Sequence, residues 1–313
     1  MATAVLSLDF HASVRGDALR EAAAQALREN RLDPKSLYVT PRQADLWRAV
    51  SRAHSPIHGN EEFIRIYQDA FAKISQDLPA SKAHLVGLGC GTGAKEKTLF
   101  SVLHESGKQA IFSAIDVSAD LVLQAAETLV EAGAEHRRSL VCDLGQVAFI
   151  QEWLDALEPD MHRLITFFGL VPNIPPSEVI RIFRTVLRPG DQLLVSVHLA
   201  PVFTDLPSAM SAVFPQYNNG ETLAWLAEGI AQSGLETELS STRMIIGERE
   251  SIPAFLGFAR WAKQPNRAPL EVFSSLRYTP PLFESLLREA GLAYKLLAIT
   301  TCRQEAIWCI RTA

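Results

Sequence analysis

Apolar residues follow two different spacings along the chain, and these predict different elements. In residues 1–80 they recur at helical spacing, so we expect helices over 17–29, 41–52 and 61–74. Residues 84–199 instead alternate short apolar runs with segments of helical pattern. We expect strands over 84–88, 110–116, 138–142, 163–168 and 192–199, and helices over 95–106, 119–132, 148–157 and 177–187. This alternation predicts a parallel, doubly wound sheet.

The regular alternation stops after residue 199. Loops and helices are expected over 200–234, and a helix over 280–290 that ends before Gly291. Strands are expected near 239–246, 270–277, 293–300 and 305–311. The predicted fold is therefore α/β, with three regions. A helical N-terminal region (1–80) contributes to the substrate site, a Rossmann-like core spans 81–200, and an α+β substrate or lid subdomain spans 201–313.

Composition narrows the classes of protein to which this chain can belong. Of its 313 residues, 48% are hydrophobic and 21% are charged, and the net charge is −5, which argues against a nucleic-acid partner. The four cysteines, at positions 90, 142, 302 and 309, show no metal-binding or disulfide spacing, so we expect reduced thiols and no metal. No apolar stretch is long enough to span a bilayer, and the N-terminus has no basic leader. We expect a cytoplasmic protein.

A glycine-rich turn follows the first core strand. The segment from Gly89 to Gly93 carries glycine at every second position, and the helix that follows presents its N-terminus to the turn. Asp116 ends the next strand. Its separation along the sequence from the glycine turn is the one at which an acid reaches ribose hydroxyls in nucleotide-binding folds. A tight turn beside a surface aspartate is the plainer interpretation. The functional interpretation is that this turn binds a nucleotide-like cofactor.

Two cofactor classes use such a turn, the dinucleotides and S-adenosylmethionine. The alternate glycines depart from the G-x-G-x-x-G spacing that seats a pyrophosphate, which favours S-adenosylmethionine. Asp143, at the end of the third core strand, can accept a hydrogen bond from an adenine amino group, although aspartate is also a common turn cap. Together with Asp116 and the glycines, Asp143 favours the cofactor.

Several motifs resemble those of a known family when they are taken in order. They are Lys35-Ser-Leu-Tyr38, Arg42-Gln-Ala-Asp-Leu-Trp47, Leu88-Gly-Cys-Gly-Thr-Gly-Ala-Lys95, Ile115-Asp-Val-Ser118, Phe168-Gly-Leu-Val-Pro-Asn173-Ile-Pro-Pro176 and Arg188-Pro-Gly-Asp-Gln-Leu-Leu194. The chain is similar to class I methyltransferases, and more narrowly resembles the histidine-specific Nα-methyltransferase family of ergothioneine biosynthesis. This resemblance implies a class I methyltransferase sheet and a small-molecule methyl acceptor, with no nucleic-acid or membrane partner.

The resemblance also implies roles for individual residues. The cofactor residues would be Gly89, Gly91, Gly93, Lys95, Asp116, Asp143 and Leu144, with Lys97 as the competitor of Lys95 for the methionine carboxylate. The substrate residues would be Tyr38, His58, Asn173, Tyr217, Phe273 and Ser275. Of these, Asn173 and Tyr217 are the expected catalytic residues, which anchor and orient the acceptor. The plainer interpretations are a loop asparagine that satisfies turn backbone and a half-buried core aromatic.

The chain departs from the family where the acceptor is chosen. The family's acid and serine that recognise imidazole align with Phe273 and Ser275, so the carboxylate is lost. A phenylalanine offers no acceptor to a ring N–H, which argues against histidine and for a less polar or aromatic group. The family's paired tyrosines are also replaced, around 56–58.

The expected activity is methyl transfer from S-adenosylmethionine to the amine nitrogen of an amino acid or a derived metabolite. Such a displacement needs placement and a neutral nucleophile more than a general base. Transfer to carbon or oxygen would need a base, for which His58, His198 and Tyr217 are the candidates, although a lone histidine is more often structural. The competing hypotheses are aminocarboxypropyl transfer, a non-catalytic S-adenosylmethionine-binding protein and, least favoured, a nicotinamide dehydrogenase.

Overall fold

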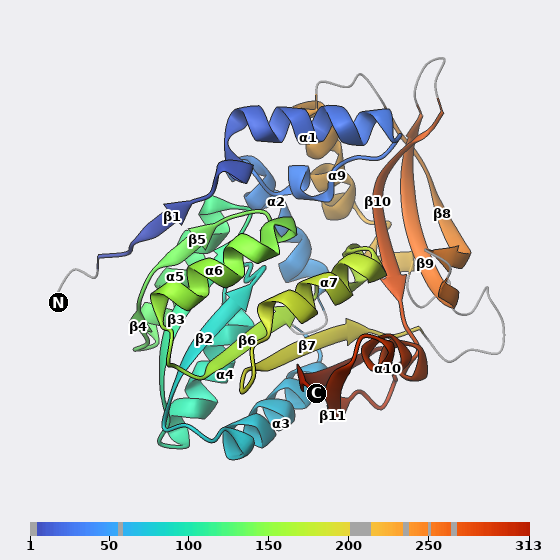
Figure 1. Cartoon of the computed structure of the whole chain (residues 1–313). Coiled ribbons are helices and arrows are strands. Elements are labelled where there is room, and N and C mark those ends of the chain that lie inside the picture. The colour runs from blue at the N-terminus through green and yellow to red at the C-terminus, as the bar shows by residue number, and fades with distance from the viewer. Residues whose placement is uncertain (1–4, 56–58, 201–213, 234–237, 250–251, 264–267) are drawn as a thin grey trace.

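The computed structural model describes residues 5–55, 59–200, 214–233, 238–249, 252–263 and 268–313, with backbone alone over most of 238–263. A central sheet of nine strands runs through the molecule (Figure 1). Its order is β1 (Leu8–Phe10), β5 (Ser139–Val141), β3 (Gln109–Asp116), β2 (Lys82–Leu88), β6 (Arg163–Phe168), β7 (Gln192–His198), β12 (Glu305–Thr312) and β11 (Leu292–Ile299), while the short β4 (Glu135–His136) pairs with β3.

The strands from β1 to β7 are parallel, and β12 pairs antiparallel with both β7 and β11. Chain order reverses at β2, since β3 lies on one side of it and β6 on the other. In open α/β sheets a ligand crevice forms at such a reversal, beyond the carboxyl ends of the strands. The glycine-rich turn follows β2 at this point.

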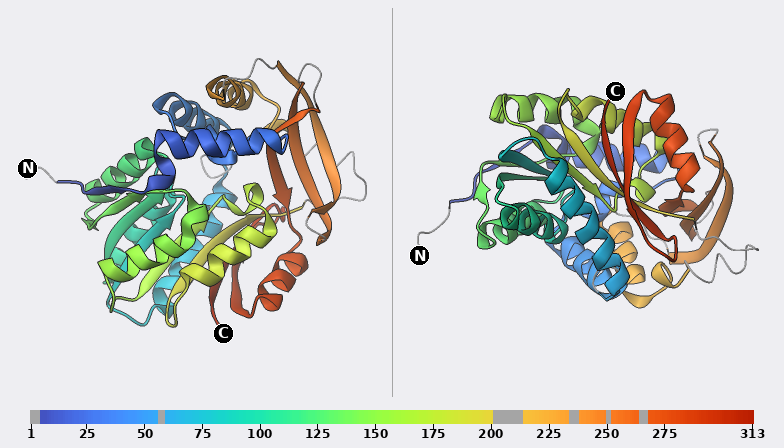
Figure 2. Two further views of the ribbon diagram at one scale, coloured as in Figure 1. Left: turned by 45° about the horizontal axis from the view of Figure 1, so that its top comes forward. Right: turned by 90° about the horizontal axis from the view of Figure 1, so that it is seen from below.

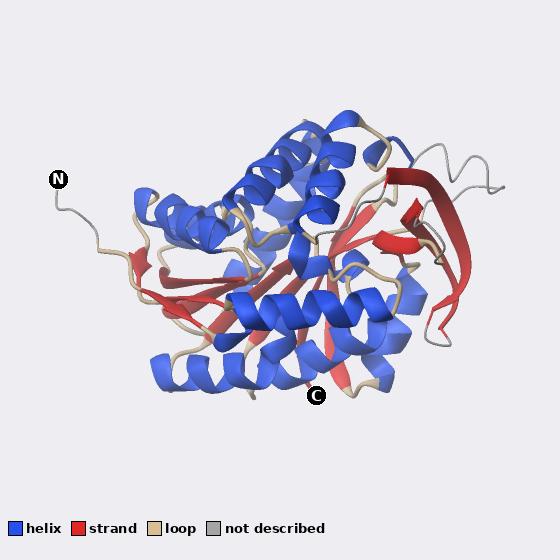
Figure 3. Cartoon of the chain, turned by 90° about the horizontal axis from the view of Figure 1, so that it is seen from above, coloured by secondary structure: helices blue, strands red, loops and turns tan. Residues whose placement is uncertain are grey.

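Helices cover both faces of the central sheet (Figure 3). Helices α3 (Glu61–Asp77), α4 (Ala94–Glu105) and α5 (Ala119–Glu131) contribute to one apolar core, which includes Phe71, Leu99 and Val122. Helices α6 (Val147–Leu157), α7 (Pro176–Val186) and α10 (Pro280–Glu289) contribute to the other. Because the inner strands are covered on both sides, their sequences are continuous apolar runs.

A second, three-stranded antiparallel sheet stands beside the central one (Figures 1 and 2). It consists of β8 (Glu238–Arg249), β9 (Ile252–Lys263) and β10 (Leu270–Arg277). A third apolar core joins β10 to helix α9 (Gly220–Gln232) and to the segment after helix α1 (Gly16–Arg28), through residues such as Leu32, Leu37 and Trp225. Helix α2 (Pro41–His54) packs against α9. The N-terminal region and the second sheet therefore meet at the carboxyl ends of the central strands.

The predicted α/β class and its parallel core are confirmed, as are the helices and strands that the apolar spacing predicted in the core. Strands β1, β4 and β9 were missed. β1 and β4 are too short to show a period, and the segment of β9 contains Pro253 and Gly257, which argue against a strand. β11 and β12, which fall in the predicted 201–313 subdomain, extend the central sheet. No described helix combines the length and the apolarity that a bilayer span requires.

Candidate functional site

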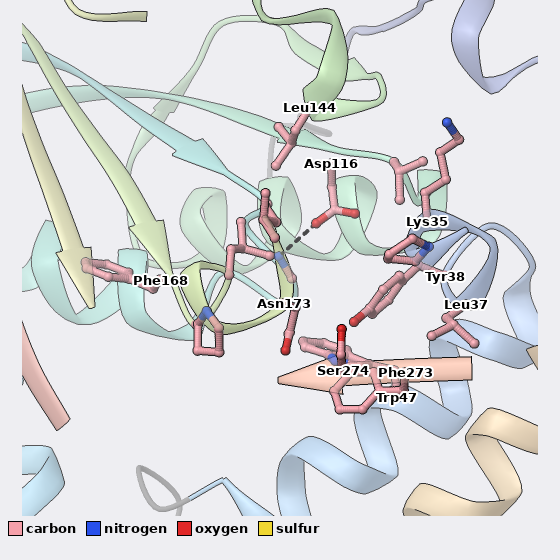
Figure 4. Close-up of a pocket in the computed structure, with 18 of the residues that line it drawn as sticks. Lys35, Leu37, Tyr38, Trp47, Asp116, Leu144, Phe168, Asn173, Phe273 and Ser274 are labelled. Atoms are coloured by element: carbon pink, nitrogen blue, oxygen red, sulfur yellow. Dashed lines mark hydrogen bonds between the residues drawn. The ribbon is translucent and has the colours of Figure 1, made fainter. Parts of the chain in front are cut away.

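A cavity of about 760 Å³ opens at the carboxyl ends of the central strands. This volume lies within the range of small-molecule sites in proteins. Residues from the N-terminal region, the strand ends of the core and strand β10 line it together (Figure 4). Among the predicted site residues, the lining includes Tyr38, Gly89, Gly91, Lys95, Asp116, Asp143, Leu144, Asn173, Tyr217 and Phe273. The fold therefore brings most of the predicted site into one space.

The glycine-rich turn forms one wall of the cavity. Gly89, Gly91 and Gly93 all have positive φ (62°, 52° and 73°), a conformation that other residues rarely adopt. A Cβ on Gly91 would lie 2.7 Å from Cη2 of Trp47, and one on Gly93 would lie 2.9 Å from the Ala125 backbone. The turn therefore needs glycine for its shape and for close packing. Gly93 itself does not line the cavity and is the N-cap residue of α4 instead.

Asp116 lies at the end of β3 and is buried, with 8% of its surface exposed. Its carboxylate accepts hydrogen bonds from the amides of Gly91 (3.3 Å) and Ser118 (3.1 Å). Burial raises the pKa of Asp116 to about 6, although the amides of Ser118, Gly91 and Val117 act in the opposite direction. A buried carboxylate in contact with the glycine turn is suited to accept hydrogen bonds from a ligand's hydroxyl groups.

Asp143 is a turn cap and also lines the cavity. Its Oδ1 accepts from the Gly145 amide (2.9 Å) as the cap of a short 3₁₀ helix (Leu144–Gln146), and its side chain also lines the cavity. Its Oδ2 lies 2.7 Å from Nζ of Lys35, which also contacts Asp33 at 3.1 Å. Leu144 lies beside it in the lining. Asp143 is thus tied to the N-terminal region by an ion pair.

The structure separates the two candidate lysines. Lys95 lines the cavity, and its Nζ lies 5.0 Å from the ring centroid of Tyr67 and 5.7 Å from that of Phe168. Lys97 is exposed and is not among the lining residues. Of these two lysines, Lys95 is the one that reaches the cavity.

Asn173 ends a 3₁₀ turn (Val171–Asn173) that packs against both β7 and β10. Its backbone amide donates to the Leu170 carbonyl (2.9 Å), which closes the turn. Figure 4 shows its side chain pointing toward the same space as the side chains of Tyr38 and Ser274. The side-chain position fits the predicted anchor, and Tyr38 lies opposite it.

Of the two residues expected to choose the acceptor, Phe273 lines the cavity and Ser275 does not. Phe273 lines the cavity, and its ring centroid lies 5.8 Å from that of Tyr217. Ser275 is fully buried outside the lining, where its Oγ is 2.8 Å from the Tyr217 hydroxyl. Ser274 takes its place in the lining. The register of β10 against β9 shifts between Glu271 and Phe273, and an irregularity of this kind re-aims neighbouring side chains.

Two histidines were named as bases. His198 lines the cavity at the end of β7, where burial, Arg277 and Lys95 hold its pKa well below the ordinary value, so its ring is neutral. His58 lies outside the described residues. His198 is therefore a weak base at the wall of the site.

The cavity residues that sequence reasoning missed include Lys35, Trp47 and Glu96. Trp47 on α2 covers Gly91, while Glu96 is buried in α4 and accepts from the Thr166 hydroxyl at 2.7 Å. Burial raises the pKa of Glu96. Lys35 and Trp47 lay inside the motifs of the resemblance, but nothing in their spacing indicated contact with the core. The described residues contain no group of three or more potential metal ligands, and the four cysteines are unpaired.

Comparison with known proteins identifies the family. A family model described as histidine-specific, S-adenosylmethionine-dependent methyltransferase matches residues 19–218. The chain belongs to this family. It is a methyltransferase that uses S-adenosylmethionine and acts on a small molecule. A search of curated proteins found no match to the sequence.

Solved structures of similar fold include several methyltransferases. DesVI of Streptomyces venezuelae is 13% identical, with a TM-score of 0.40 over 88% of this chain and 100% of that one. A methyltransferase of Bacteroides fragilis, crystallised with S-adenosylhomocysteine, is 12% identical, with a TM-score of 0.38 over 78% and 77%. A possible exported protein of Bordetella parapertussis is 14% identical, with a TM-score of 0.47 over 95% of both chains.

Several groups of the cavity are chemically suited to parts of S-adenosylmethionine. Trp47 fills the space that a Cβ on Gly91 would need, so the turn keeps this shape only with glycine there. Asp116 offers carboxylate acceptors beside that turn, Asp143 offers them at the next strand end, and Lys95 offers a cation in the same cavity. These groups match a ribose, an adenine and a carboxylate in chemistry.

Proposed function

We propose that this methyltransferase transfers the methyl group to the amine nitrogen of an amino acid, or of a metabolite derived from one, whose side chain is apolar or aromatic. One observation supports this most directly. The cavity joins the cofactor wall, formed by the glycine turn and Asp116, to a second wall formed by Asn173, Tyr217 and Phe273. Donor and acceptor would therefore share one enclosed space.

Each of the cofactor residues would contact a different part of S-adenosylmethionine. Asp116 would accept from the ribose hydroxyls, Asp143 from the adenine amino group, and Lys95 would pair with the methionine carboxylate. Leu144 would pack on the adenine edge. When bound, S-adenosylmethionine supplies an electrophilic methyl group on a sulfonium. The residues of the protein then mainly have to position the acceptor.

The acceptor side would place an uncharged amine. Asn173 and Tyr217 offer amide and hydroxyl groups that can bind an amine and aim its lone pair. An ammonium group cannot attack, and Lys95 and Arg277 near this wall disfavour a further positive charge. The amine would lose its proton to solvent before transfer, because His198 is too weak a base to hold it.

Phe273 supports an acceptor other than histidine. It lies with Tyr217 and Trp225 in an aromatic group, at centroid distances of 5.8 Å from each. The Phe273 ring provides apolar contact area and, unlike the family's carboxylate, no acceptor for an imidazole N–H. An apolar or aromatic acceptor fits it better than histidine.

Label transfer tests this function. The protein is incubated with methyl-labelled S-adenosylmethionine and a panel of amino acids and aromatic amines, and the products are identified by mass, which also separates methyl from aminocarboxypropyl transfer. We expect N-methylation of an aromatic or apolar amino acid above that of histidine. Efficient trimethylation of histidine would overturn the proposed acceptor class, and cofactor binding without any transfer would overturn the activity on amines.

The Asn173→Ala variant tests the anchor. We expect it to lose at least about tenfold in transfer while its affinity for S-adenosylmethionine stays within about twofold, since the amide would touch only the acceptor. Asn218→Ala is the matched control, because Asn218 is exposed and outside the lining. Equal activity of the two variants would show that Asn173 does not anchor the acceptor.

A further inference from the structure

One face of helix α2 lines the cavity. It carries Trp47, Val50, Ser51 and His54, which stand at positions i, i+3, i+4 and i+7 of the helix. Trp47 covers the glycine turn, because its Cη2 would lie 2.7 Å from a Cβ on Gly91. His54 is the last residue of α2 and lies about 10 Å further along the helix axis, since each residue adds about 1.5 Å. This face of α2 therefore extends from the cofactor wall to His54.

His54 is hydrogen-bonded to Glu221 of α9. Its Nε2 lies 3.0 Å from Oε2 of Glu221, which stands in the first turn of that helix. Glu221 follows Tyr217 by four residues, and Tyr217 belongs to the acceptor wall. The contact therefore connects the end of α2 to the segment that carries an acceptor residue, so His54 lies on the acceptor side of the glycine turn.

The hydrogen bond determines which ring nitrogen can take a proton. The hydrogen bond with His54 and the backbone amide of Glu221 itself hold the pKa of Glu221 below its ordinary value, so this side chain is a carboxylate that only accepts. Nε2 of His54 therefore carries the hydrogen, and Nδ1 carries the lone pair of the neutral ring. A histidine that a carboxylate holds in this way has the usual arrangement of a general base.

His198, the other histidine of the lining, is a poorer proton acceptor. Burial, Arg277 and Lys95 hold its pKa well below the ordinary value. The same two cations disfavour an ammonium group at this wall, and an amine that enters as an ammonium has to give up a proton before it can attack. His54 lines the cavity while 25% of its side chain is exposed, so it can receive that proton and return it to water.

We propose that His54 is the base that takes a proton from the ammonium group of the methyl acceptor, with Glu221 as the residue that positions its ring. This inference rests on the proposed function and deepens it, because it gives the proton of the amine a route out of the cavity. An N–H bond of the ammonium breaks, its electron pair stays on nitrogen, and Nδ1 of His54 binds the proton.

The groups around His54 complete this step. Glu221 and the C-terminal end of α2 stabilise the imidazolium, which returns the proton to water at its exposed edge. The lone pair on the acceptor nitrogen then forms the bond to the methyl carbon, and the electron pair of the C–S bond goes to sulfur.

The pH dependence of activity tests this base in the full-length protein. The rate constant kcat/KM for methylation of phenylalanine and of tryptophan is measured for wild type and His54→Gln at pH 7 and at about pH 10, where a free α-amine is largely neutral. We expect the variant to lose about 100-fold at pH 7, as for loss of a general base, and to come within about threefold of wild type at the higher pH. Groups of the cofactor site titrate alike in both proteins, so they cancel in the ratio.

Matched variants separate the base from its surroundings. Glu221→Gln should lose part of the same activity at pH 7, because an amide orients the ring less firmly. The controls are Glu228→Gln, which removes a carboxylate from the same helix outside the lining, and His104→Gln, which removes an exposed histidine of α4. Both should retain wild-type kcat/KM. Imidazole in the buffer should restore activity at pH 7 to His54→Ala but not to Asn173→Ala, which retains His54.

The outcomes separate the two proposals. If wild type methylates no amino acid or amine, the proposed function fails and the assignment of His54 falls with it. If wild type is active but His54→Gln loses equally at both pH values, or loses nothing at pH 7, the proposed function stands and the assignment of His54 is overturned. An equal loss is the result expected of a contact that only joins α2 to α9, and thermal unfolding of the variant measures that contribution directly.

Discussion

Nζ of Lys35 lies 2.7 Å from Oδ2 of Asp143, which joins the N-terminal region to the core across 108 positions of sequence. Both side chains line the cavity, and about a fifth of each is exposed. Burial acts to lower the pKa of Lys35, but the hydrogen bond to Asp143 and the charges of Asp33 and Asp143 raise it overall. The ammonium therefore stays charged and holds the carboxylate.

The Lys35→Met variant should bind S-adenosylmethionine about three- to tenfold more weakly, a loss of about 1 kcal/mol. Without the ammonium, Asp33 and Asp143 leave two unneutralised acids at the cavity wall, and the segment at residues 33–38 loses an anchor. Titration calorimetry measures the change, with Lys97→Met as control. Tighter binding would show instead that Lys35 competes with the adenine for Asp143.

Asp116 should make the ligand-free protein less stable as the pH rises from about 4 to 6. Its folded pKa of about 6 exceeds the unfolded value of 3.8, so in this interval the folded state binds the proton more tightly. The penalty is complete above pH 6 and amounts to about 3 kcal/mol at most. Chemical unfolding of wild type and Asp116→Asn over pH 4–7 measures it. In the variant, the free energy of unfolding should not show this fall with pH. If the two proteins show the same dependence of unfolding free energy on pH, the raised pKa of Asp116 is contradicted.

The same carboxylate should make cofactor binding weaken as the pH falls through about 6. A protonated Asp116 loses acceptor capacity toward ribose hydroxyls, while the ionised form keeps it. We expect the Kd for S-adenosylmethionine to rise below pH 6 in the wild type. In Asp116→Asn the Kd should be raised by about tenfold or more at pH 7, with this pH step removed. An unchanged Kd in the variant would exclude Asp116 from the ribose site.

Gly91→Ala should weaken cofactor binding, whereas Gly107→Ala should affect stability alone. Both glycines have positive φ (52° and 74°), so each alanine costs about 1–2 kcal/mol of backbone strain. The added Cβ meets Trp47 at 2.7 Å in the first case and nothing within 4 Å in the second. Unfolding and cofactor titrations on both variants separate strain from shape. Equal cofactor affinity in the two variants would show that the glycine turn does not contact the cofactor.

The sequence predicted those features of the fold and the site that depend on residues close together in the chain. The core strands and helices were predictable because each repeats a two- or 3.6-residue pattern of its own. Asp116 and Asp143 were named because each stands at the end of a strand, and parallel strands end at one edge, whereas Asn173 was named from the family's motif.

Contacts between distant segments left no such pattern. The insertion of β12 between β7 and β11 is set by pairing across about 110 residues, and the Lys35 ion pair depends on how the N-terminal region packs. The exchange of Ser275 for Ser274 in the cavity wall accompanies a register irregularity in β10, which sequence alternation cannot locate.

The side chain at position 273 should decide between aromatic acceptors and histidine. In Phe273→Ala we expect kcat/KM for the preferred aromatic amino acid to fall about tenfold, since the ring contacts with Tyr217 and Trp225 that shape this wall are lost. In Phe273→Glu a carboxylate faces the cavity, and an imidazole N–H then finds an acceptor that no apolar side chain supplies. The ratio of kcat/KM for histidine to that for phenylalanine should therefore rise in Phe273→Glu and not in Phe273→Ala. Competition assays with both amino acids present measure this ratio directly, and an unchanged ratio in both variants would show that another part of the cavity chooses the acceptor.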